Sequence, residues 1–356
     1  MLGVMSGTSL DGVDLVLARF HEDGERWRWE ILAGEARSYT EEWREKLSAA
    51  FSMEAPQLLA LHAEYGHYLG GVVRSFLAGK VVPLAVVSHG HTVFHRPDEG
   101  YTFQLGEGSA VAAESGLPVV YDLRAADVAL GGEGAPLVPV GDWHLFGDYG
   151  LCLNLGGFSN VSYESEGRRI AFDICPVNLA MQHLVKPLGL AYDRDGELGR
   201  AGRVDERLLA ELEALDYYHQ PPPRSLGREW LEEVFLPLFD RSALAPQDKL
   251  RTLYEHIVRQ IVGQTAARHD GRMLVTGGGA HNRFLMELLR QQFPGEVVIP
   301  SAQVVDLKEA LIFAFLGLLR LLGRPNTLAS VTGALRDVVA GSVADPWGKL
   351  EPEKII

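Results

Sequence analysis

The chain has 356 residues, which is more than one typical hydrophobic core supports and predicts two domains. Its composition is 47% hydrophobic and 22% charged, which excludes an intrinsically disordered chain. The formal net charge of -14 argues against a nucleic-acid partner, because an acidic surface repels phosphate backbones, but it is compatible with a nucleotide held by backbone amides and a metal ion.

The amino-terminal region has no signal for export. It lacks a basic segment followed by an apolar one, and Asp11 comes early. The most apolar stretch, residues 310–319, is too short to span a bilayer and predicts a buried helix. Cys152 and Cys175 have neither metal-ligand spacing nor a disulfide pattern. We therefore expect a cytoplasmic protein with no membrane partner.

The first half of the chain predicts strands, then helices, then further strands. Residues 2–5 and 13–20 are apolar runs separated by a short polar turn, which predicts a β-hairpin, and residues 27–39 predict a third strand. The elements expected after them are helices at 41–51 and 57–77 and strands at 82–87, 101–105 and 118–121.

The second half repeats this order. Apolar runs on either side of Gly156-Gly157 predict another hairpin, and a third strand is expected at 169–172. The elements expected after them are helices at 177–185, 204–215, 246–268, 283–292 and 306–322 and a strand at 272–276. Because both halves begin with strand, glycine turn and strand, they suggest a duplicated α/β unit.

The first hairpin turn has the composition of a phosphate-binding loop. Gly7 and Gly12 let the backbone approach a ligand closely, and the N–H groups of such a turn can converge on phosphate oxygens. Asp11 is a candidate magnesium ligand, because magnesium prefers carboxylate and water oxygens. An ordinary polar turn is the alternative. The cofactor-binding candidates are Gly7, Thr8, Ser9, Leu10, Asp11, Gly12, Val13 and Asp14.

Two further glycine turns are candidates for the same ligand. Gly156 and Gly157 form the turn of the second hairpin. Gly277, Gly278 and Gly279 lie between a strand and a helix, where a backbone turn suits an adenosine or an α-phosphate. Each turn alone is a weak signal. Three of them in this order predict an actin-like ATPase that binds ATP.

Collinear motifs over nearly the whole chain resemble the anhydro-N-acetylmuramic acid kinase family. They lie at 3–14, 88–97, 104–107, 119–139, 153–161, 172–178, 192–193, 201–202, 223–229, 276–282 and 309–310. The resemblance implies an α/β, two-domain actin-like ATPase (ribonuclease H-like) fold with mixed sheets flanked by helices. It also implies a homodimer.

The expected domains follow from this resemblance. The first comprises 1–138 plus 336–356 and would carry the first phosphate hairpin and the sugar contacts. The second comprises 139–335 and would carry the second hairpin, the adenosine site and the catalytic aspartate.

The resemblance implies a kinase that uses ATP and Mg2+. It would hydrolyse the 1,6-anhydro ring of 1,6-anhydro-N-acetylmuramic acid and phosphorylate the 6-oxygen, giving N-acetylmuramic acid 6-phosphate and ADP in peptidoglycan recycling. The 6-oxygen is an ether oxygen in this substrate and has no proton to lose. A general base must therefore act on the attacking water.

Asp173 is the candidate general base, because it follows the strand expected at 169–172 and would face the cleft from its end. The family segment resembles Asp-Thr-Gly-Pro-Gly-Asn, and this chain has Cys175 and Val177 in place of the two glycines. Capping of the next helix is an alternative role for Asp173, and both roles can coexist. Asp122 is the second candidate for the base.

The candidate sugar contacts are His89, Asp122, Arg124, Asn178 and Glu309. Arg124 has the fork that matches a lactyl carboxylate, and an interdomain salt bridge is the alternative. Glu309 is expected to begin the last helix, where a solvated first-turn carboxylate is the alternative. His89, His91 and His95 have a spacing that can ligate zinc. The family has a glutamine at the position of His91, so hydrogen bonding to the sugar is favoured for His89.

Two other functions stay open. An actin-like conformational ATPase would use the same phosphate hairpins, and it would need neither Asp173 nor Arg124. A kinase for a different sugar is the other, and the residues that differ from the family keep it open: His91, Glu133, Cys175 and Val177. In that case Asp173 would deprotonate a sugar hydroxyl directly.

Overall fold

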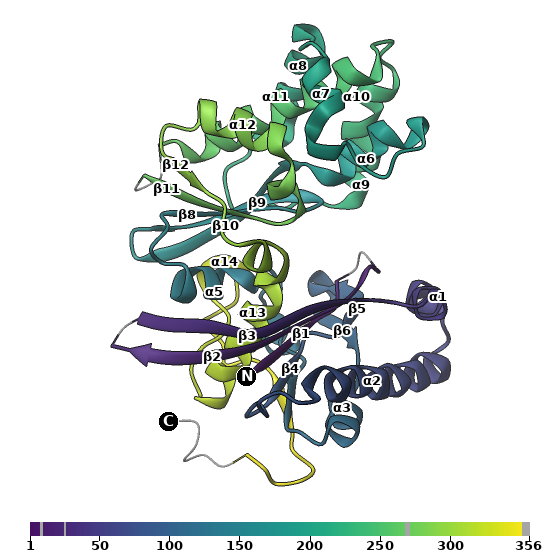
Figure 1. Cartoon of the computed structure of the whole chain (residues 1–356), viewed down its shortest axis with the longest axis vertical. Coiled ribbons are helices and arrows are strands. Elements are labelled where there is room, and N and C mark those ends of the chain that lie inside the picture. The colour runs from purple at the N-terminus through teal and green to yellow at the C-terminus, as the bar shows by residue number, and fades with distance from the viewer. Residues whose placement is uncertain (8–9, 25, 268–270, 351–356) are drawn as a thin grey trace. The chain divides into compact units, whose positions relative to one another are not determined.

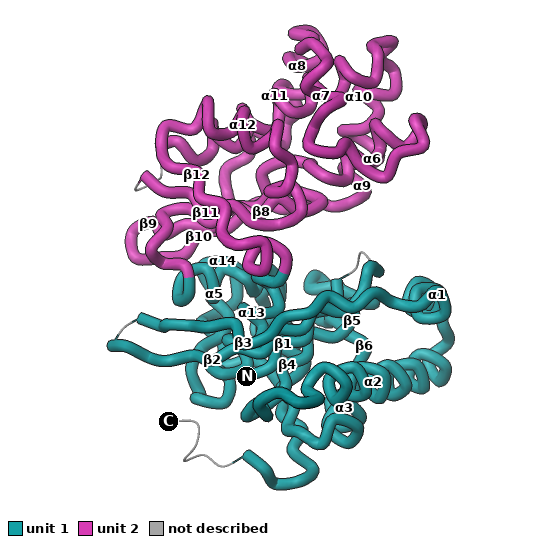
Figure 2. The backbone as a smooth tube through the Cα atoms, in the orientation of Figure 1, with its two compact units in different colours: residues 1–145, 307–356 teal, residues 146–306 magenta. Residues whose placement is uncertain are grey.

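The computed structural model describes residues 1–7, 10–24, 26–267 and 271–350. The chain forms two compact units, shown in separate colours in Figure 2. Unit 1 comprises Met1–Leu145 and Leu307–Ile356, and unit 2 comprises Phe146–Asp306. Each unit contains its own mixed sheet with flanking helices (Figure 1).

Unit 1 is built on a six-stranded sheet in the order β13-β7-β4-β1-β2-β3. Its strands are β1 (Leu2–Met5), β2 (Gly12–Asp23), β3 (Arg26–Ser38), β4 (Val86–Ser88), β7 (Val119–Tyr121) and β13 (Ser342–Ala344). The pairs β1–β2 and β2–β3 are antiparallel, whereas β1–β4 and β4–β7 are parallel. The first predicted hairpin is therefore confirmed, and β13 pairs with β7 and so returns residues 342–344 to this sheet.

Helices and a small hairpin complete unit 1. They are α1 (Glu41–Ala49), α2 (Ala55–Leu77), α3 (Gly108–Ser115), α4 (Ala125–Ala129), α5 (Val138–Leu145), most of α13 (Ala302–Leu321), α14 (Ala329–Thr332) and the hairpin of β5 (His91–Arg96) and β6 (Tyr101–Leu105). In α2, Leu61, Tyr65, Leu69, Val72 and Phe76 are buried at the three- and four-residue spacing of an amphipathic helix. This face packs into the core that β1, β2 and β4 share.

The division between the units differs from the expected domains in the segment 307–335. The helix α13 packs on the sheet of unit 1 so closely that a side chain at Gly3 would collide with the carbonyl oxygen of Ala310. Gly317 lies equally close to Val87 in β4. Small residues at the contact therefore attach residues 307–321 to unit 1. The first crossing between the units follows α5, at 145/146 instead of 138/139.

Unit 2 repeats the arrangement with a five-stranded sheet in the order β10-β9-β8-β11-β12. Its strands are β8 (Leu151–Leu155), β9 (Phe158–Ser165), β10 (Arg168–Pro176), β11 (Arg272–Thr276) and β12 (Glu296–Val298). Its helices are α6 (Asn178–Val185), α7 (Glu197–Ala201), α8 (Glu206–Glu213), α9 (Arg228–Trp230), α10 (Leu236–Asp240), α11 (Pro246–Thr265) and α12 (Arg283–Gln292). The strands β8, β9 and β10 are successively antiparallel, and β11 and β12 run parallel to β8.

Both units thus place three antiparallel strands beside two parallel ones in the same order along the sheet. This duplicated arrangement is that of the ribonuclease H-like fold, and it confirms the predicted actin-like fold class.

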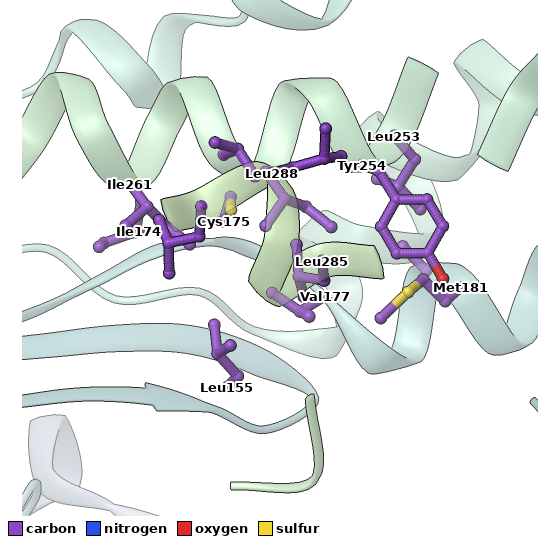
Figure 3. Close-up of a cluster of buried hydrophobic side chains, with 14 of the residues drawn as sticks. Leu155, Ile174, Cys175, Val177, Met181, Leu253, Tyr254, Ile261, Leu285 and Leu288 are labelled. Atoms are coloured by element: carbon purple, nitrogen blue, oxygen red, sulfur yellow. The ribbon is translucent and has the colours of Figure 1, made fainter. Parts of the chain in front are cut away.

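The core of unit 2 contains both residues that replace family glycines. Cys175 and Val177 are fully buried. Figure 3 shows them among apolar side chains of the sheet and of the helices α6, α11 and α12, including Leu155, Met181 and Leu285. The side chains that distinguish this segment from the family pattern therefore fill the interior of unit 2.

Three local predictions were wrong in their bounds. The strand expected at 82–87 is confined to Val86–Ser88, because Pro83 lacks the N–H group that a central strand donates. The strand β10 continues past residue 172 to Pro176, because its pairing with β9 resumes after an irregularity between Asp173 and Cys175. The helix α13 begins at Ala302, where the side chain of Ser301 accepts a hydrogen bond from the N–H of Val304.

Candidate functional site

The first candidate phosphate loop is the turn between β1 and β2. Its residues Thr8 and Ser9 lie outside the described part of the chain. Leu10 has a positive φ of 60°, and Asp11 is exposed. Gly12 pairs with Ser38 of β3, and Val13 is fully buried in the core of unit 1. Close packing against β3 therefore explains why residue 12 is a glycine, and burial in the core explains the apolar side chain of Val13.

The segment after β4 lies beside this turn. The backbone N–H of His89 donates to the carbonyl of Val4 at 3.0 Å. His91 is buried, and its ring lies close to the backbone at Gly7. The residue that replaces the family glutamine thus contacts the candidate phosphate loop directly.

His89 is held as a neutral imidazole. Burial, assisted by the Arg124 charge, lowers the pKa of His89 to about 3. Its Nδ1 lies 2.7 Å from the carbonyl oxygen of Gly90, and its Nε2 accepts hydrogen bonds from Arg124. These partners define a tautomer that donates from Nδ1 and accepts at Nε2.

Arg124 is oriented by acceptors on two sides. Its Nε and Nη2 donate to Nε2 of His89 at 3.1 and 2.7 Å, and its Nη1 donates to the carbonyl of Gly134 at 2.6 Å. Burial lowers the pKa of Arg124 to about 10, against the attraction of Glu309 and Asp127, so the guanidinium stays charged at neutral pH. An arginine has five N–H donors, so one N–H on each terminal nitrogen is left over for a ligand.

The loop that supplies Gly134 is itself anchored. The carboxylate of Asp127 accepts from the N–H of Gly134 at 2.8 Å and from the hydroxyl of Thr332 at 2.9 Å. Asp127 is fully buried, so it acts as a structural support for the position of Arg124.

Asp122 and His89 line one cavity of about 150 Å³ in unit 1. Asp122 has a positive φ of 53°, a conformation that costs a non-glycine residue about 1–2 kcal/mol and that is often retained at functional sites. Burial raises the pKa of its carboxyl, and a hydrogen bond from the backbone at Ala125 opposes that shift. Three predicted sugar contacts, His89, Asp122 and Arg124, therefore lie together in unit 1.

Glu309 is exposed on α13 and attracts Arg124 electrostatically. The expectation that it begins the helix was wrong, because α13 starts seven residues earlier, at Ala302. Glu309 is therefore not a first-turn carboxylate. Its neighbour Lys308 forms a buried ion pair with Asp142 at 2.6 Å, which fixes this turn of α13 against α5.

In unit 2 the second and third glycine turns lie next to each other. Thr276 of β11 pairs with Asn154 of β8, so both strands end side by side. Gly277 has a φ of 82°, and a Cβ there would lie 2.5 Å from Oδ1 of Asn154 and 2.9 Å from the carbonyl carbon of Leu155. Only glycine fits this backbone. The parallel pairing of β8 and β11 thus brings together two turns that are separated by 120 residues.

The start of α6 joins these two turns. The N–H groups of Val177 and Asn178 donate to the carbonyls of Gly157 and Gly156, at 2.9 and 3.2 Å. The side chain of Asn178 donates to the carbonyl of Leu155 at 3.0 Å. Asn178 and Gly278 also line a cavity of about 470 Å³, which is within the size range of small-molecule sites. Asn178 therefore lies with the predicted adenosine turn.

Asp173 sits at the irregularity in β10 and is held by backbone groups. Its Oδ2 accepts from the N–H of Leu226 at 2.8 Å, and its own N–H donates to the carbonyl of Arg224 at 3.0 Å. Burial raises the pKa of Asp173 to about 6, although the bond from Leu226 lowers it. Val177, and not Asp173, is the N-cap of α6, so the capping alternative was wrong.

The residues around Asp173 were missed in the sequence. The hydroxyl of Tyr217 donates to the carbonyl of Asp173 at 2.6 Å. The guanidinium of Arg224 donates to the carbonyls of Tyr217 and Gln220 and lies 4.8 Å from the centre of the Tyr217 ring. The family motif at 223–229 was the signal that could have indicated them, since it placed a basic residue next to the Leu226 segment.

Within the described ranges, no three His, Cys, Asp or Glu side chains are grouped so that they could hold a metal ion. No helix in the same ranges is long and apolar enough to cross a membrane.

Comparison with known proteins indicates one family over nearly the whole chain. The model of the family described as anhydro-N-acetylmuramic acid kinase matches residues 1–346. A protein of that name from Aliivibrio fischeri is 35% identical over 96% of this chain and 98% of its own length. Those from Vibrio cholerae and Cupriavidus pinatubonensis are 35% and 37% identical, over 97% and 96% of this chain and 98% and 97% of their own lengths. The chain belongs to the anhydro-N-acetylmuramic acid kinase family.

Proposed function

We propose that this chain is an ATP-dependent kinase that opens the 1,6-anhydro ring of 1,6-anhydro-N-acetylmuramic acid and phosphorylates its 6-oxygen. The observation that carries the proposal is Asp173, a carboxylate held by the N–H of Leu226 with a pKa raised to about 6 by burial. A base with this pKa is largely deprotonated at neutral pH and still accepts a proton readily. The relatives named anhydro-N-acetylmuramic acid kinase support the choice of substrate.

In the proposed reaction, Asp173 takes a proton from water as the water oxygen bonds to the anomeric carbon. The bond between that carbon and the 6-oxygen breaks, and the 6-oxygen bonds to the γ-phosphorus of ATP. The bond from the γ-phosphorus to the bridging oxygen breaks and releases ADP. The products are N-acetylmuramic acid 6-phosphate, ADP and the proton held by Asp173.

Arg124 is proposed to bind the lactyl carboxylate of the sugar. One free N–H on each terminal nitrogen is what bidentate recognition of a carboxylate requires. Because His89 is neutral, it orients the guanidinium without adding a competing charge. His89, Asp122 and Glu309 are the further sugar contacts that we propose.

The nucleotide is proposed to use the glycine turns. The backbone would approach ATP closely at Gly156, Gly157, Gly277, Gly278 and Gly279. Asn178 is held beside these turns, because its side chain donates to the carbonyl of Leu155. Gly7, Thr8, Ser9, Leu10, Gly12 and Asp14 stay candidates for phosphate contacts through the first hairpin. Asp11 is an exposed single carboxylate, which suits Mg2+ that keeps water and phosphate ligands. Mg2+ bound there would offset the charge of the transferring phosphoryl group.

The test is mass spectrometry of 1,6-anhydro-N-acetylmuramic acid incubated with the protein, Mg2+ and ATP in oxygen-18 water. We expect a product heavier by one phosphoryl group and one labelled water. A phosphorylated product without the label would contradict a water-activating Asp173. ATP consumption without a sugar product would contradict the choice of substrate and favour a conformational ATPase.

A homodimer and a cytoplasmic location are also proposed, from the family resemblance. Sedimentation of the purified protein measures the first, and a dimer mass is expected. Fractionation of cells that produce the chain measures the second.

A further inference from the structure

One tyrosine hydroxyl connects two of the segments that line the larger cavity in unit 2. This cavity of about 470 Å³ is lined by residues 192–195, which include Asp193, and by residues after β11, which include Gly278 and Asn282. Tyr254 of α11 is fully buried in the core of unit 2 (Figure 3). Its hydroxyl oxygen lies 3.0 Å from Oδ2 of Asp193 and 2.7 Å from Nδ2 of Asn282, so it holds one residue from each segment.

The direction of these two hydrogen bonds follows from the groups involved. Burial raises the pKa of Tyr254, so its hydroxyl stays protonated at neutral pH. A carboxylate only accepts hydrogen bonds, so the hydroxyl donates to Asp193 and its oxygen accepts from the amide of Asn282. The Oδ1 of Asn282 accepts from the N–H of Leu285 at 3.0 Å and caps α12. Both ends of the Asn282 side chain are therefore held by the protein.

The carboxylate of Asp193 is also held by the protein. Its Oδ1 accepts from the N–H of Leu198 at 2.9 Å. Its Oδ2 accepts from the N–H of Gly199 at 3.1 Å, in addition to the hydroxyl of Tyr254. Asp193 is 5% exposed. Three donors therefore engage this carboxylate, and its role is to support the cavity wall formed by residues 192–195.

The segment that follows Asp193 packs on α11 through glycines. A Cβ at Gly199 would lie 2.2 Å from the ring of Tyr254, and a Cβ at Gly202 would lie 2.1 Å from the carbonyl oxygen of Gln247. A larger residue at either position would displace the segment from α11. The sequence motifs at 192–193 and 201–202 are explained by this contact, because both attach the cavity wall to the helix that carries Tyr254.

From these contacts we propose that Tyr254 is a positioning residue for the nucleotide. Its hydroxyl sets the spacing between the wall at Asp193 and the glycine turn 277–279. Asn282 continues that turn, since its N–H donates to the carbonyl of Gly279 at 3.1 Å. Tyr254 is fully buried, so it acts through Asp193 and Asn282. This inference rests on the proposed function, which assigns ATP to the glycine turn, and adds to it a residue that determines nucleotide affinity.

The test is Tyr254→Phe, which removes one oxygen and keeps the ring. Asp193 and Asn282 lose their common partner, so we expect KM for ATP to rise by about 3- to 10-fold while kcat and KM for the sugar change by less than about twofold. The dissociation constant of ADP, measured by calorimetry without turnover, should rise by the same factor. Asp193→Asn replaces an acceptor oxygen with a donor and should have the same effects. In the double variant the increase should be smaller than the product of the two single effects, because both residues belong to one network.

Thr265→Val is the matched control. Thr265 is buried on the same helix, about three turns further along, and its hydroxyl donates to the carbonyl of Ile261 at 2.7 Å. The substitution therefore also removes one buried hydroxyl group from α11. KM for ATP and the dissociation constant of ADP should stay at the values of the natural chain.

The outcomes separate this positioning role from the proposed function. An unchanged affinity for ADP in folded Tyr254→Phe would overturn the role, and so would an equal loss of affinity in Thr265→Val, which would indicate a general effect of destabilising α11. If Tyr254→Phe does not fold, Asp193→Asn decides by the same measurements. A natural chain that binds ADP but phosphorylates no sugar would overturn the proposed function, whereas the ADP measurements would still decide the role of Tyr254. Absence of ADP binding in the natural chain would overturn both.

Discussion

Units 1 and 2 share a strand order, but the residue with the central proposed role is an arginine in unit 1 and an aspartate in unit 2. In unit 1 the proposed sugar-binding residue Arg124 is a cation, which is oriented by the neutral acceptors His89 and Gly134. In unit 2 the proposed general base Asp173 is an anion when deprotonated, and it is oriented by the backbone donor of Leu226. The duplicated sheet determines where polar groups can lie, and the residue at each place determines what chemistry that group can perform.

In the proposed function, this difference separates sugar binding by Arg124 from proton transfer by Asp173. Arg124 keeps its charge at neutral pH, because its pKa of about 10 is still far above 7. A permanent charge suits the recognition of an anionic sugar. Asp173 has a pKa of about 6, so its charge changes near neutral pH, which suits proton transfer. We therefore expect substitutions in unit 1 to change KM and substitutions around Asp173 to change kcat.

The largest expected effect is that of Asp173→Asn. Asparagine cannot accept the proton of water, so kcat should fall by about 100- to 10,000-fold with little change in KM for the sugar. Initial rates of ADP release with saturating ATP measure both constants. Asp98→Asn, at an exposed aspartate, is the control and should retain the rate of the natural chain. An increase in KM for the sugar with an unchanged kcat would instead assign Asp173 to sugar recognition, and the contrast between the two units would fail.

Arg124→Lys should have the next largest effect. Lysine keeps the charge but loses the fork, so about 1.5–3 kcal/mol of binding, or about 10- to 150-fold in KM for the sugar, should be lost while kcat changes less. Arg336→Lys, at an exposed arginine, is the matched control. The expectation fails if kcat falls and KM stays constant.

The pH dependence of kcat/KM should follow the carboxyl of Asp173. Only its deprotonated form can act as the base, so the rate should fall by about tenfold per pH unit as the pH decreases below about 6, and it should be level above that pH. His89 has a pKa of about 3 and stays neutral over this range. Rates between pH 4.5 and 8 provide the measurement. A level profile down to pH 4.5 would mean that the catalytic carboxyl has an ordinary pKa.

The smallest expected effect is that of Tyr217→Phe. It removes the hydrogen bond from the Tyr217 hydroxyl to the carbonyl of Asp173 and keeps the ring that lies against Arg224. A loss of about 0.5–1.5 kcal/mol, or about 2- to 12-fold in kcat, is expected, because the carboxyl becomes less well positioned. Tyr101→Phe, at an exposed tyrosine of β6, should leave kcat unchanged. An increase of the same size in KM, with kcat unchanged, would argue that Tyr217 does not position Asp173.

The sequence by itself determined the fold class and the longer strands and helices, whereas short elements such as β5, β12, β13, α3 and α5 were not predicted. The two glycine hairpins, α2, α11 and α12 follow the hydrophobic spacing closely, because that spacing is a local property of the chain. The candidate residues came from motifs, and His89, Asp122 and Arg124 do lie together in unit 1. The bounds were less accurate where pairing or capping extended an element, as at Asp173 in β10 and Ser301 before α13.

Only the tertiary structure decided which partners orient these residues. Leu226 reaches Asp173 from 53 positions along the chain, and His89 reaches Arg124 from 35 positions. The close contact of Ala310 with Gly3 attached α13, and with it Glu309, to unit 1. Such contacts depend on strand register and on packing between distant segments. Periodicity reports only which face of each element is buried, so it cannot specify the neighbour that buries it.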